Sequence, residues 1–343
     1  MIFYVKSFLI GSLFVSLLLH DNLKADSNWP SWRGSTGNGT APDTSNPPTE
    51  WSEEKNILWK TKLEGLGHST PVIWEDKIFL TSAVPFGKKT IPPVPDNAPG
   101  SHDNLPVSQS HRFLVICIDK KSGKIIWKTK CHESFPHEGG HKSGSLASAS
   151  PVTDGKHLFA YFGSHGLFSI DCKTGKIIWK RDFGTMATKH GHGEGSSPAL
   201  RGNALIINWD HEKQSAIYAL NKLTGENLWK VERKEVTSWS SPLIVEVDNT
   251  NQVIISATDR IRGYDLNDGR IIWECSGMSN NVVASPVSDN GKVYLGCSYD
   301  KRALIAINLN GAKGDITDTS HVMWTTNKRT PYVPSPLLYK ETL

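Results

Sequence analysis

The sequence is short of cysteine, of long apolar runs and of any strong imbalance of charge. Its 343 residues include five cysteines, an odd number with no C-x-x-C spacing and no vicinal pair, which excludes a disulfide scaffold. The formal net charge of +4 is mild, and without clustered Lys and Arg it indicates no nucleic-acid partner. No G-x-S-x-G elbow, Walker loop or H-E-x-x-H helix occurs, so motifs give no support for a hydrolase or a nucleotide enzyme.

One apolar run stands out near the start of the sequence. It extends from Phe8 to Leu19, follows Lys6 and precedes Ala25, the arrangement typical of a secretory signal peptide over residues 1–25. The run is shorter than the roughly 20 residues that span a bilayer, so we expect no transmembrane segment after signal removal. The mature chain is therefore expected to be secreted or periplasmic.

What the sequence has in abundance is a repeat. Four copies of one motif read D-K-K-S-G-K-I-I-W at 119–127, D-C-K-T-G-K-I-I-W at 171–179, N-K-L-T-G-E-N-L-W at 221–229 and D-L-N-D-G-R-I-I-W at 265–273. An alternating apolar run precedes each copy, so the motif predicts a strand, a tight turn and a strand. The turn glycine can take positive φ without a Cβ penalty, and the indole can fill the gap between neighbouring sheets. The residues in these two roles are Gly123, Gly175, Gly225 and Gly269, and Trp127, Trp179, Trp229 and Trp273.

A Ser-Pro or Thr-Pro dipeptide alternates with this motif and sets the period. From Trp179 the tryptophans step by 50, 44 and 51 residues to Trp229, Trp273 and Trp324, which suits one four-stranded propeller blade. Proline is tolerated at the first residue of a strand, so the dipeptide predicts the start of each innermost strand. A β-sandwich is the alternative, but it has no need of a Trp at a fixed repeat position. The dipeptides begin at Thr70, Ser150, Ser197, Ser241, Ser285 and Ser335.

Together these marks predict an all-β chain that forms a β-propeller over residues 57–343. We expect about five complete four-stranded blades with partial first and last units, preceded by an extended Trp-, Gly- and Pro-rich segment at 26–56. Residues 57–60 resemble the final strand of a repeat, which in a ring would complete the last blade and remove its open edge. The sixth unit begins at Ser335 and stops at Leu343, so we expect the sequence to be truncated from a larger closed ring.

The fuller motif A-x-D-x-x-T-G-x-x-x-W, seen at 219–229, resembles the tryptophan-docking repeat of pyrroloquinoline-quinone-like propellers. Cys117, Ser169 and Gly263 replace its first alanine in the other copies. The resemblance covers about residues 57–339, and the stretches W-P-S-W-R-G, G-x-G-E-G-S-S-P-A and N-W-D-H-E look like those of secreted bacterial members. This family includes quinoprotein alcohol dehydrogenases and a non-enzymatic lipoprotein of the outer-membrane β-barrel assembly machine. The resemblance is specific for fold and weak for function.

The resemblance also bears on cofactors. The resembling dehydrogenases hold their quinone beside a vicinal Cys-Cys disulfide, with a Ca²⁺ bound by carboxylate and amide oxygens and an Asp as general base. This sequence has no vicinal cysteines and is much shorter than such an enzyme. We therefore do not expect pyrroloquinoline quinone (PQQ) to bind, and a divalent metal is the alternative cofactor.

Strand parity gathers polar side chains on one face of the predicted propeller. In an up-and-down blade the loop before the innermost strand and the turn between the second and third strands share a face. The candidate ligand-binding residues in these loops are His137, His141, His190, His192, Glu194, Asp210, His211, Trp239, Asn281 and Arg302. The H-x-H-x-E spacing of His190, His192 and Glu194 predicts a metal site, with backbone-bonded polar packing as the alternative. A Pro-rich insertion between Ser82 and His111 belongs to the same face, either as a lid or as surface decoration.

These features predict a secreted or periplasmic propeller scaffold that binds a protein or an extracellular ligand through its His-rich loop face. The alternative is a quinone- or metal-dependent oxidoreductase related to the quinoprotein dehydrogenases. A scaffold needs only the rim, whereas an enzyme needs a metal or quinone site that the sequence does not clearly specify. The prediction therefore favours binding over catalysis.

Overall fold

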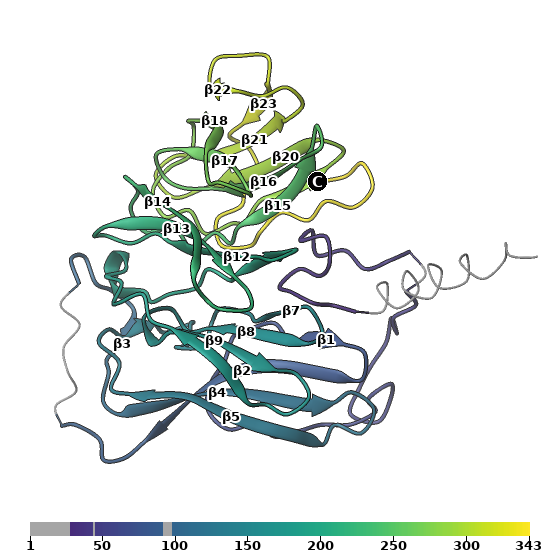
Figure 1. Ribbon diagram of the computed structural model, residues 1–343, viewed down its shortest axis with the longest axis vertical. Helices are drawn as coiled ribbons and strands as arrows, with labels where there is room; N and C mark the ends of the chain where they lie inside the picture. Colours follow the sequence, from purple (N-terminus) through teal and green to yellow (C-terminus); the bar gives the residue numbers. More distant parts are fainter. Residues whose placement is uncertain (1–27, 44, 92–97) are drawn as a thin grey trace, which may run out of the picture.

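Five antiparallel four-stranded units, one of which gains a fifth strand in parallel, follow one another along the chain and from the lower to the upper part of Figure 1. The computed structural model describes residues 28–43, 45–91 and 98–343, so the predicted signal peptide at 1–25 lies outside the described residues. The sheets are blades 1 to 5 below, in chain order. They confirm the prediction of an all-β propeller with five four-stranded units.

The strands of each blade come from consecutive chain segments. Blade 1 holds β1 (Val72–Trp74), β2 (Lys77–Phe86), β4 (Ser110–Asp119) and β5 (Ile125–Ser134); blade 2 holds β7 (Val152–Thr153), β8 (His157–Tyr161), β9 (Leu167–Asp171) and β10 (Ile177–Arg181); blade 3 holds β11 (Ala199–Arg201), β12 (Ala204–Trp209), β13 (Ser215–Asn221) and β14 (Asn227–Arg233). Blade 4 holds β15 (Leu243–Val247), β16 (Thr250–Ile255), β17 (Ile261–Asp265) and β18 (Ile271–Cys275); blade 5 holds β19 (Val287–Asp289), β20 (Lys292–Cys297), β21 (Ala303–Asn308) and β23 (Val322–Thr326). Two short strands, β3 (Asn104–Leu105) and β6 (Gly140–His141), pair with each other, and β22 (Gly314–Asp315) pairs in parallel with β18.

The hydrophobic core is divided into layers between successive blades. The second strand of blade 2, H-L-F-A-Y, and that of blade 3, A-L-I-I-N-W, are buried along their whole length, because each lies between two neighbouring sheets. The fourth strands alternate instead, as I-I-W-K-R of β10 does, since they form the outer edge. Four clusters of buried side chains fill the four spaces between the five blades. Burial of apolar area between blades is thus the main stabilising term of the stack.

The Ser-Pro and Thr-Pro dipeptides precede the first strand of each blade, as predicted, and join neighbouring blades. Each serine hydroxyl accepts a hydrogen bond from the backbone N–H at the corresponding position of the preceding blade. These bonds run from Thr70 to Ser150, Ser150 to Ser197, Ser197 to Ser241, Ser241 to Ser285 and Ser285 to Ser335, each at 2.9 Å. The repeated serine therefore holds the innermost strands in register around the axis.

The repeated tryptophan docks on the turn glycine of the following blade. A Cβ built on Gly175, Gly225 or Gly269 would lie 2.7 Å from the indole of Trp127, Trp179 or Trp229, and all three glycines have positive φ. Each indole Nε1 donates to a carbonyl of the same turn, Cys172, Lys222 and Leu266 at 3.3, 2.9 and 2.9 Å. Trp229 is buried, whereas Trp127 and Trp179 are half-buried. Glycine is required here both for its φ and for the close approach of the ring.

Residues 57–60 carry the same docking contact without forming a strand. Trp59 packs on Gly123 of blade 1, where a Cβ would meet the indole at 2.5 Å, and its Nε1 donates to the carbonyl of Lys120 at 3.0 Å. Thr61 donates to the Gly123 carbonyl at 2.5 Å, as Thr129 does to Gly175 one blade on. Trp59 thus takes the position that a preceding blade would supply. The prediction that 57–60 complete the last blade of a ring stays a prediction.

The N-terminal segment, residues 28–43, crosses the inner strands of several blades and lies between the lower and upper blades at the right of Figure 1. Trp29 pairs with Ile73 of blade 1 through two backbone hydrogen bonds of 2.8 Å, and Pro30 accepts from Thr153 of blade 2 at 2.9 Å. The Asn38 amide exchanges two hydrogen bonds with Ser288 of blade 5, at 2.7 and 3.0 Å. The segment therefore links the first, second and fifth blades directly.

Candidate functional site

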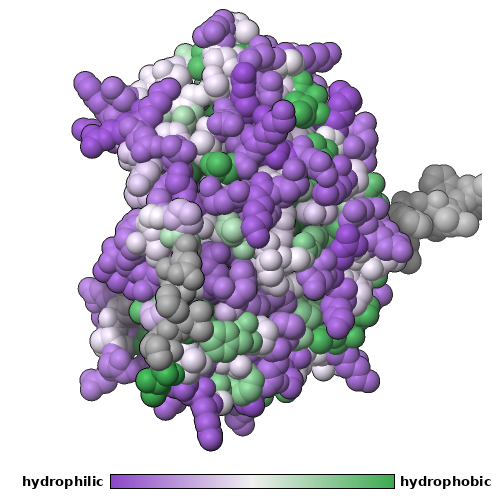
Figure 2. Space-filling view, turned by 90° about the vertical axis from the view of Figure 1, so that its left-hand side faces the viewer, coloured by the Kyte–Doolittle hydropathy of each residue, from purple (hydrophilic) through white to green (hydrophobic). Residues whose placement is uncertain are grey.

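One face of the propeller collects the loops that the sequence assigned to it. Those before the first strands connect β5 to β7, β10 to β11, β14 to β15 and β18 to β19, and the turns between second and third strands lie at the same ends of the blades. Figure 2 looks onto the left-hand side of Figure 1, where hydrophilic groups dominate and hydrophobic groups are scattered between them. This surface is called the loop face below.

Four imidazoles gather on the loop face. The ring centroid of His102 lies 5.1 Å from that of His190 and 4.7 Å from that of His192. The ring centroid of His192 lies 5.0 Å from that of His141 and 5.3 Å from that of His190. The Trp239 ring lies 6.4 Å from His192, and its Nε1 donates to the Gly193 carbonyl at 2.7 Å. Three predicted residues, His141, His190 and His192, therefore meet beside Trp239. These four histidines are called the His cluster below.

The Pro-rich insertion builds one side of the cluster, as its predicted parity required. Asn104 in β3 pairs with His141 in β6, and its side-chain amide donates to the carbonyls of His190 and Gly191 at 2.7 and 3.0 Å. The insertion also supplies His102, which the sequence analysis did not select. His102 is distant in sequence from the other three histidines, so no spacing pattern indicated it. Its place in an insertion on the predicted face could have indicated it. Residues 92–97 of the insertion, including Pro92, Pro93 and Pro95, lie outside the described residues.

Two ring nitrogens of the cluster have no hydrogen-bond partner among the described residues. His190 Nε2 and His192 Nε2 are both buried, and neither bonds to any residue that the structure describes. The opposite nitrogen of His190 contacts the Pro99 carbonyl at 3.2 Å. Burial lowers the pKa of His192, with His102 and His141 acting in the same direction, so the ring is neutral at pH 7. A neutral imidazole can donate or accept, and a buried one without a partner is unusual.

Glu194 is directed to a different site. Its carboxylate accepts hydrogen bonds from the backbone N–H of Ser164, at 2.7 Å, and from the Ser164 hydroxyl. A Cβ at Gly163 would lie 1.3 Å from Glu194 Oε2, so only glycine leaves room for this side chain. Burial raises the pKa of Glu194 to about 7, against the opposing effect of the Ser164 hydrogen bonds. Glu194 lines a small cavity with His137 and Tyr161 instead of joining His190 and His192.

The predicted metal site is not assembled in this structure. Among the residues with described positions, no three His, Cys, Asp or Glu side chains are arranged to hold a metal ion. The H-x-H-x-E spacing brings the two imidazoles together but sends the carboxylate toward Ser164. Metal binding by His190, His192 and Glu194 therefore has no support from the geometry.

The remaining predicted residues occupy separate positions. Asp210 forms a buried ion pair with Arg233, Oδ1 to Nε at 3.1 Å, and His211 Nε2 contacts the Gln214 carbonyl at 3.1 Å. His137 Nε2 contacts the Met186 carbonyl at 2.8 Å. Asn281 is buried with a φ of 58°, and Arg302 lines a broad groove between blades 4 and 5. These contacts organise the loops and do not extend the His cluster.

An apolar hollow opens beside the cluster. It has a volume of about 210 Å³ and is lined by Leu66, Leu105, Val107, His141 and Leu146 among others. Leu66 and Leu105 are 53% and 55% exposed, so the hollow is open to a partner. Polar rings beside exposed aliphatic groups are the composition expected of a recognition surface rather than of a closed active site.

The blades, the inner serine ladder and the docked tryptophans define the class of the fold, a PQQ-like β-propeller. A family profile described as outer membrane protein assembly factor BamB matches residues 111–336, more than half of the chain. The chain belongs to this family. In the part of the chain with described positions, no helix has the length and apolar character needed to cross a membrane.

Curated relatives are distant. The outer membrane protein assembly factor BamB of Shewanella oneidensis is 22% identical over 195 residues, which is 56% of this chain and 45% of that protein. Tetrathionate hydrolase of Acidithiobacillus ferrooxidans is 22% identical over 259 residues, 70% of this chain and 47% of that protein. The chain thus spans about half the length of the curated relatives it matches.

A solved structure shares the fold. Quinohemoprotein alcohol dehydrogenase from Comamonas testosteroni superposes with a TM-score of 0.52 at 11% sequence identity, covering 90% of this chain and 50% of that one. At this identity the likeness shows a common propeller architecture.

Proposed function

We propose that this protein is an exported, secreted or periplasmic, propeller scaffold whose loop face binds a protein partner through the His cluster and the adjacent apolar hollow. The observation that carries the proposal is the pair of buried imidazole nitrogens, His190 Nε2 and His192 Nε2, without partners among the described residues. An unsatisfied buried polar atom costs about 1–3 kcal/mol. A partner recovers that free energy if its binding turns one of these rings so that Nε2 reaches the surface.

The chemistry of the hollow favours a protein over a small polar ligand. Exposed Leu66 and Leu105 lie beside His141, so a partner side chain could be buried while its polar edge meets the imidazoles. The related proteins named as outer membrane protein assembly factors act in an assembly process, which agrees with a role that depends on contacts between proteins. The matched region is about half of their length, so this remains a proposal for the present chain.

The protonation state of the loop face gives the proposal a pH dependence. Burial lowers the pKa values of His111, His192 and His211, and lowers that of His165 to about 3. A histidine with a folded pKa below its unfolded value of about 6.5 contributes stability that is present above pH 6.5 and is lost as pH falls through the folded value. We therefore expect the loop face to loosen, and partner binding to weaken, between pH 6.5 and 5. Hydrogen exchange measured at pH 7.5 and 5.0, and corrected for the intrinsic exchange rate at each pH, tests this. Protection of these loops should fall more on acidification than protection of the turns on the opposite face.

Site-specific photo-crosslinking in the native host would test partner binding. The crosslinker replaces Leu105 on the loop face or, as a matched control, Leu223, which is 54% exposed in a turn on the opposite face. We expect one predominant protein adduct from position 105 and none of it from position 223. The double variant His190→Ala/His192→Ala should remove the adduct while the folded fraction stays unchanged. Equal adducts from both positions, or an adduct that ignores the double variant, would contradict the proposal.

The oxidoreductase alternative fits the residues less well. The five cysteines are separate free thiols, so the vicinal disulfide of the resembling quinone site has no counterpart. The described residues also lack a three-ligand metal group. A visible absorption spectrum and metal analysis of protein purified from its host test this alternative. A bound quinone or metal would support it.

A further inference from the structure

A second cavity lies at the axis, along the inner strands. The N-terminal segment lines one side of it, and the first strands of blades 2 to 4 line the other. Its volume is about 170 Å³, far more than the roughly 10–15 Å³ that one water occupies on such a measure. None of the residues proposed above for partner binding contributes to it.

The lining of this axial cavity has basic side chains and no acidic ones. The residues that line it include Arg33 and Arg201 but no Asp or Glu. Arg201 reaches out to Glu246, with Nη2 to Oε2 at 2.9 Å. Arg33, by contrast, has no carboxylate within ion-pair distance among the described residues, and its guanidinium donates only to the carbonyls of Gly37, Asn38 and Pro336 at 3.1, 2.7 and 2.5 Å. The cavity therefore contains one cation whose charge is not balanced nearby.

The backbone of the N-terminal segment is shaped to hold Arg33 in this place. Arg33 has a φ of 78°, a conformation that residues other than glycine seldom adopt. Burial lowers the pKa of Arg33, which reflects the loss of water around the charged group. Arginine nevertheless remains charged at neutral pH, and Arg33 is half-buried with no carboxylate within ion-pair distance among the described residues. A balancing anion would therefore have to come from outside the described chain.

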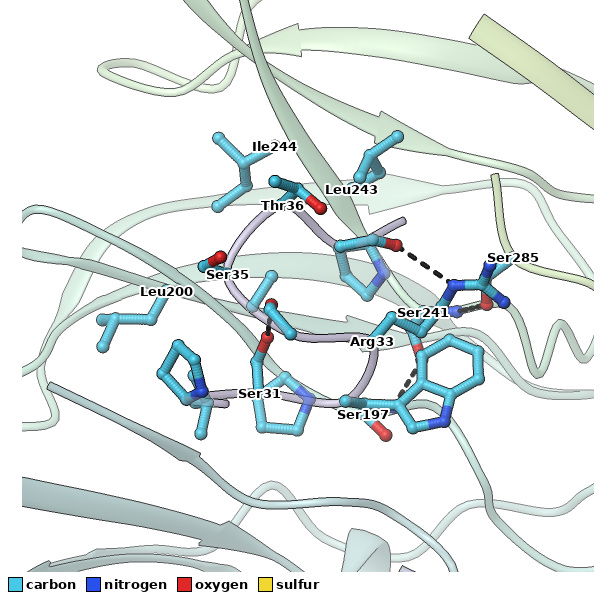
Figure 3. Close-up of a pocket in the computed structure, with 18 of the residues that line it drawn as sticks. Ser31, Arg33, Ser35, Thr36, Ser197, Leu200, Ser241, Leu243, Ile244 and Ser285 are labelled. Carbon is cyan, nitrogen blue, oxygen red and sulfur yellow. Dashed lines mark hydrogen bonds between the residues drawn. The ribbon is translucent and has the colours of Figure 1, made fainter. Parts of the chain in front are cut away.

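Hydroxyl donors complete the lining. Ser197, Ser241 and Ser285 each accept one backbone N–H of the serine ladder, and among the described residues no acceptor takes their own hydrogens. Figure 3 shows these three serines following one another along the cavity with Arg33 and Thr36 on the facing segment. A guanidinium and several hydroxyl donors without carboxylates are the donor set that binds oxygen anions.

We propose that the axial cavity is a binding site for a small oxyanion, a phosphate, sulfate or short dicarboxylate, held by Arg33 and the serine hydroxyls. The bound anion would neutralise Arg33 and join the N-terminal segment to the inner strands of blades 2 to 5. Its site is independent of the loop face, so failure of one proposal leaves the other intact.

The test is a thermal-shift and calorimetric titration of the full chain with inorganic phosphate, sulfate or malonate, at constant ionic strength set with sodium chloride. We expect a saturable rise in Tm with at least one of these anions, and none with the uncharged probe glycerol. Response to phosphate and sulfate alone identifies a tetrahedral anion, and response to malonate alone identifies a carboxylate ligand. No saturable response to any of the three overturns the proposal.

Two variants locate the site. Arg33→Met should weaken the apparent affinity for the anion at least tenfold. It also removes the bond to the Pro336 carbonyl and could unfold the N-terminal segment. Thr36→Glu, at an exposed position that lines the cavity, adds a carboxylate to the cavity without deleting the contacts of Arg33. It should abolish the anion-induced shift while the Tm without anion changes little, since only the exposed bond from Asn38 N–H to the Thr36 hydroxyl is lost. Asn267→Glu is the control, because it makes the same change of charge in an exposed turn outside the cavity. This variant should bind the anion with the affinity of the unmodified chain. Binding that survives Thr36→Glu, or that Asn267→Glu also removes, would exclude this cavity.

Discussion

The interfaces of blades 1 to 4 and the interface between blades 4 and 5 use the same repeated tryptophan in two different ways. Trp127, Trp179 and Trp229 reach across to the turn glycine of the next blade. Trp273 turns back over its own blade, where its Nε1 donates to Gln252 Oε1 at 2.8 Å. In blade 5 the corresponding position, six residues after Ala306, is Ala312, and the neighbouring Gly311 has nothing within 4 Å of its Cβ position. One motif therefore gives two packing outcomes.

Two local changes account for the difference. In the other blades Ala, Ser or Cys occupies the first motif position, whereas blade 4 has Gly263, and a Cβ there would lie 2.3 Å from Trp273 Nε1. In blade 5 the connection between the third and fourth strands extends over 309–321, compared with 120–124 in blade 1, and it lays β22 along β18. The docking turn is thus displaced, and a vacant space above Gly263 accepts the indole. Trp273 consequently has 0% exposure, and its ladder partner in that connection is Gly314.

The largest effect is expected from removing a docked indole. Trp229→Ala should lower the free energy of unfolding by about 3–5 kcal/mol, because it leaves a cavity between blades 3 and 4 and removes the bond to the Leu266 carbonyl. Trp324→Ala is the matched control, since Trp324 is 40% exposed and should cost about 1 kcal/mol or less. Urea unfolding followed by far-ultraviolet circular dichroism measures both. Equal losses would show that docking contributes nothing beyond ordinary burial.

The turn glycines separate conformational from packing effects. Gly269→Ala should cost about 2–4 kcal/mol, since it combines a left-handed φ of 76° with a Cβ 2.7 Å from the Trp229 ring. Gly311→Ala has a similar φ of 71° but open space around the Cβ, so only the conformational part, about 1–2 kcal/mol, should remain. The same unfolding measurement applies. A Gly311 variant as damaging as the Gly269 variant would mean that the docking contact has little weight.

Local repetition explains why so much of the fold was predictable. The Asp or Asn of each motif closes its turn by the same bond, as from Asp119 N–H to the Lys124 carbonyl at 2.8 Å, so a short stretch of sequence specifies strand, turn and strand. The Ser-Pro starts follow from the restriction that proline places on strands. The strand alternation in turn fixed which loops share a face. Each of these inferences needs only neighbouring residues.

Contacts between distant segments were beyond this reasoning. The direction of Glu194 depends on Gly163, thirty-one positions earlier, whose missing Cβ opens the space that the carboxylate fills. His102 joins the cluster only because β3 pairs with β6. The N-terminal segment gave no periodic signal, since it is held by individual bonds rather than by a repeat: backbone bonds to Ile73 and Thr153, and bonds of the Asn38 side chain to Ser288. Side-chain direction in irregular loops is set by tertiary contacts that a single sequence does not display.

The exchange of alanine for glycine at position 263 supplies the last test of the comparison. In Gly263→Ala the new Cβ would come within 2.3 Å of Trp273 Nε1, so the indole must rotate and give up its bond to Gln252. Because the ring can move, the loss of stability should stay near 1 kcal/mol, the lower end for an overpacked site. The change should be clearer in fluorine NMR of fluorotryptophan-labelled protein, where the Trp273 resonance, assigned with Trp273→Phe, should shift. Since blade 5 has Ala312 in place of the docking glycine, the ring should become more exposed to a solvent quencher. A Trp273 resonance that keeps its position would show that the longer connection of blade 5, and not Gly263, directs the indole inward.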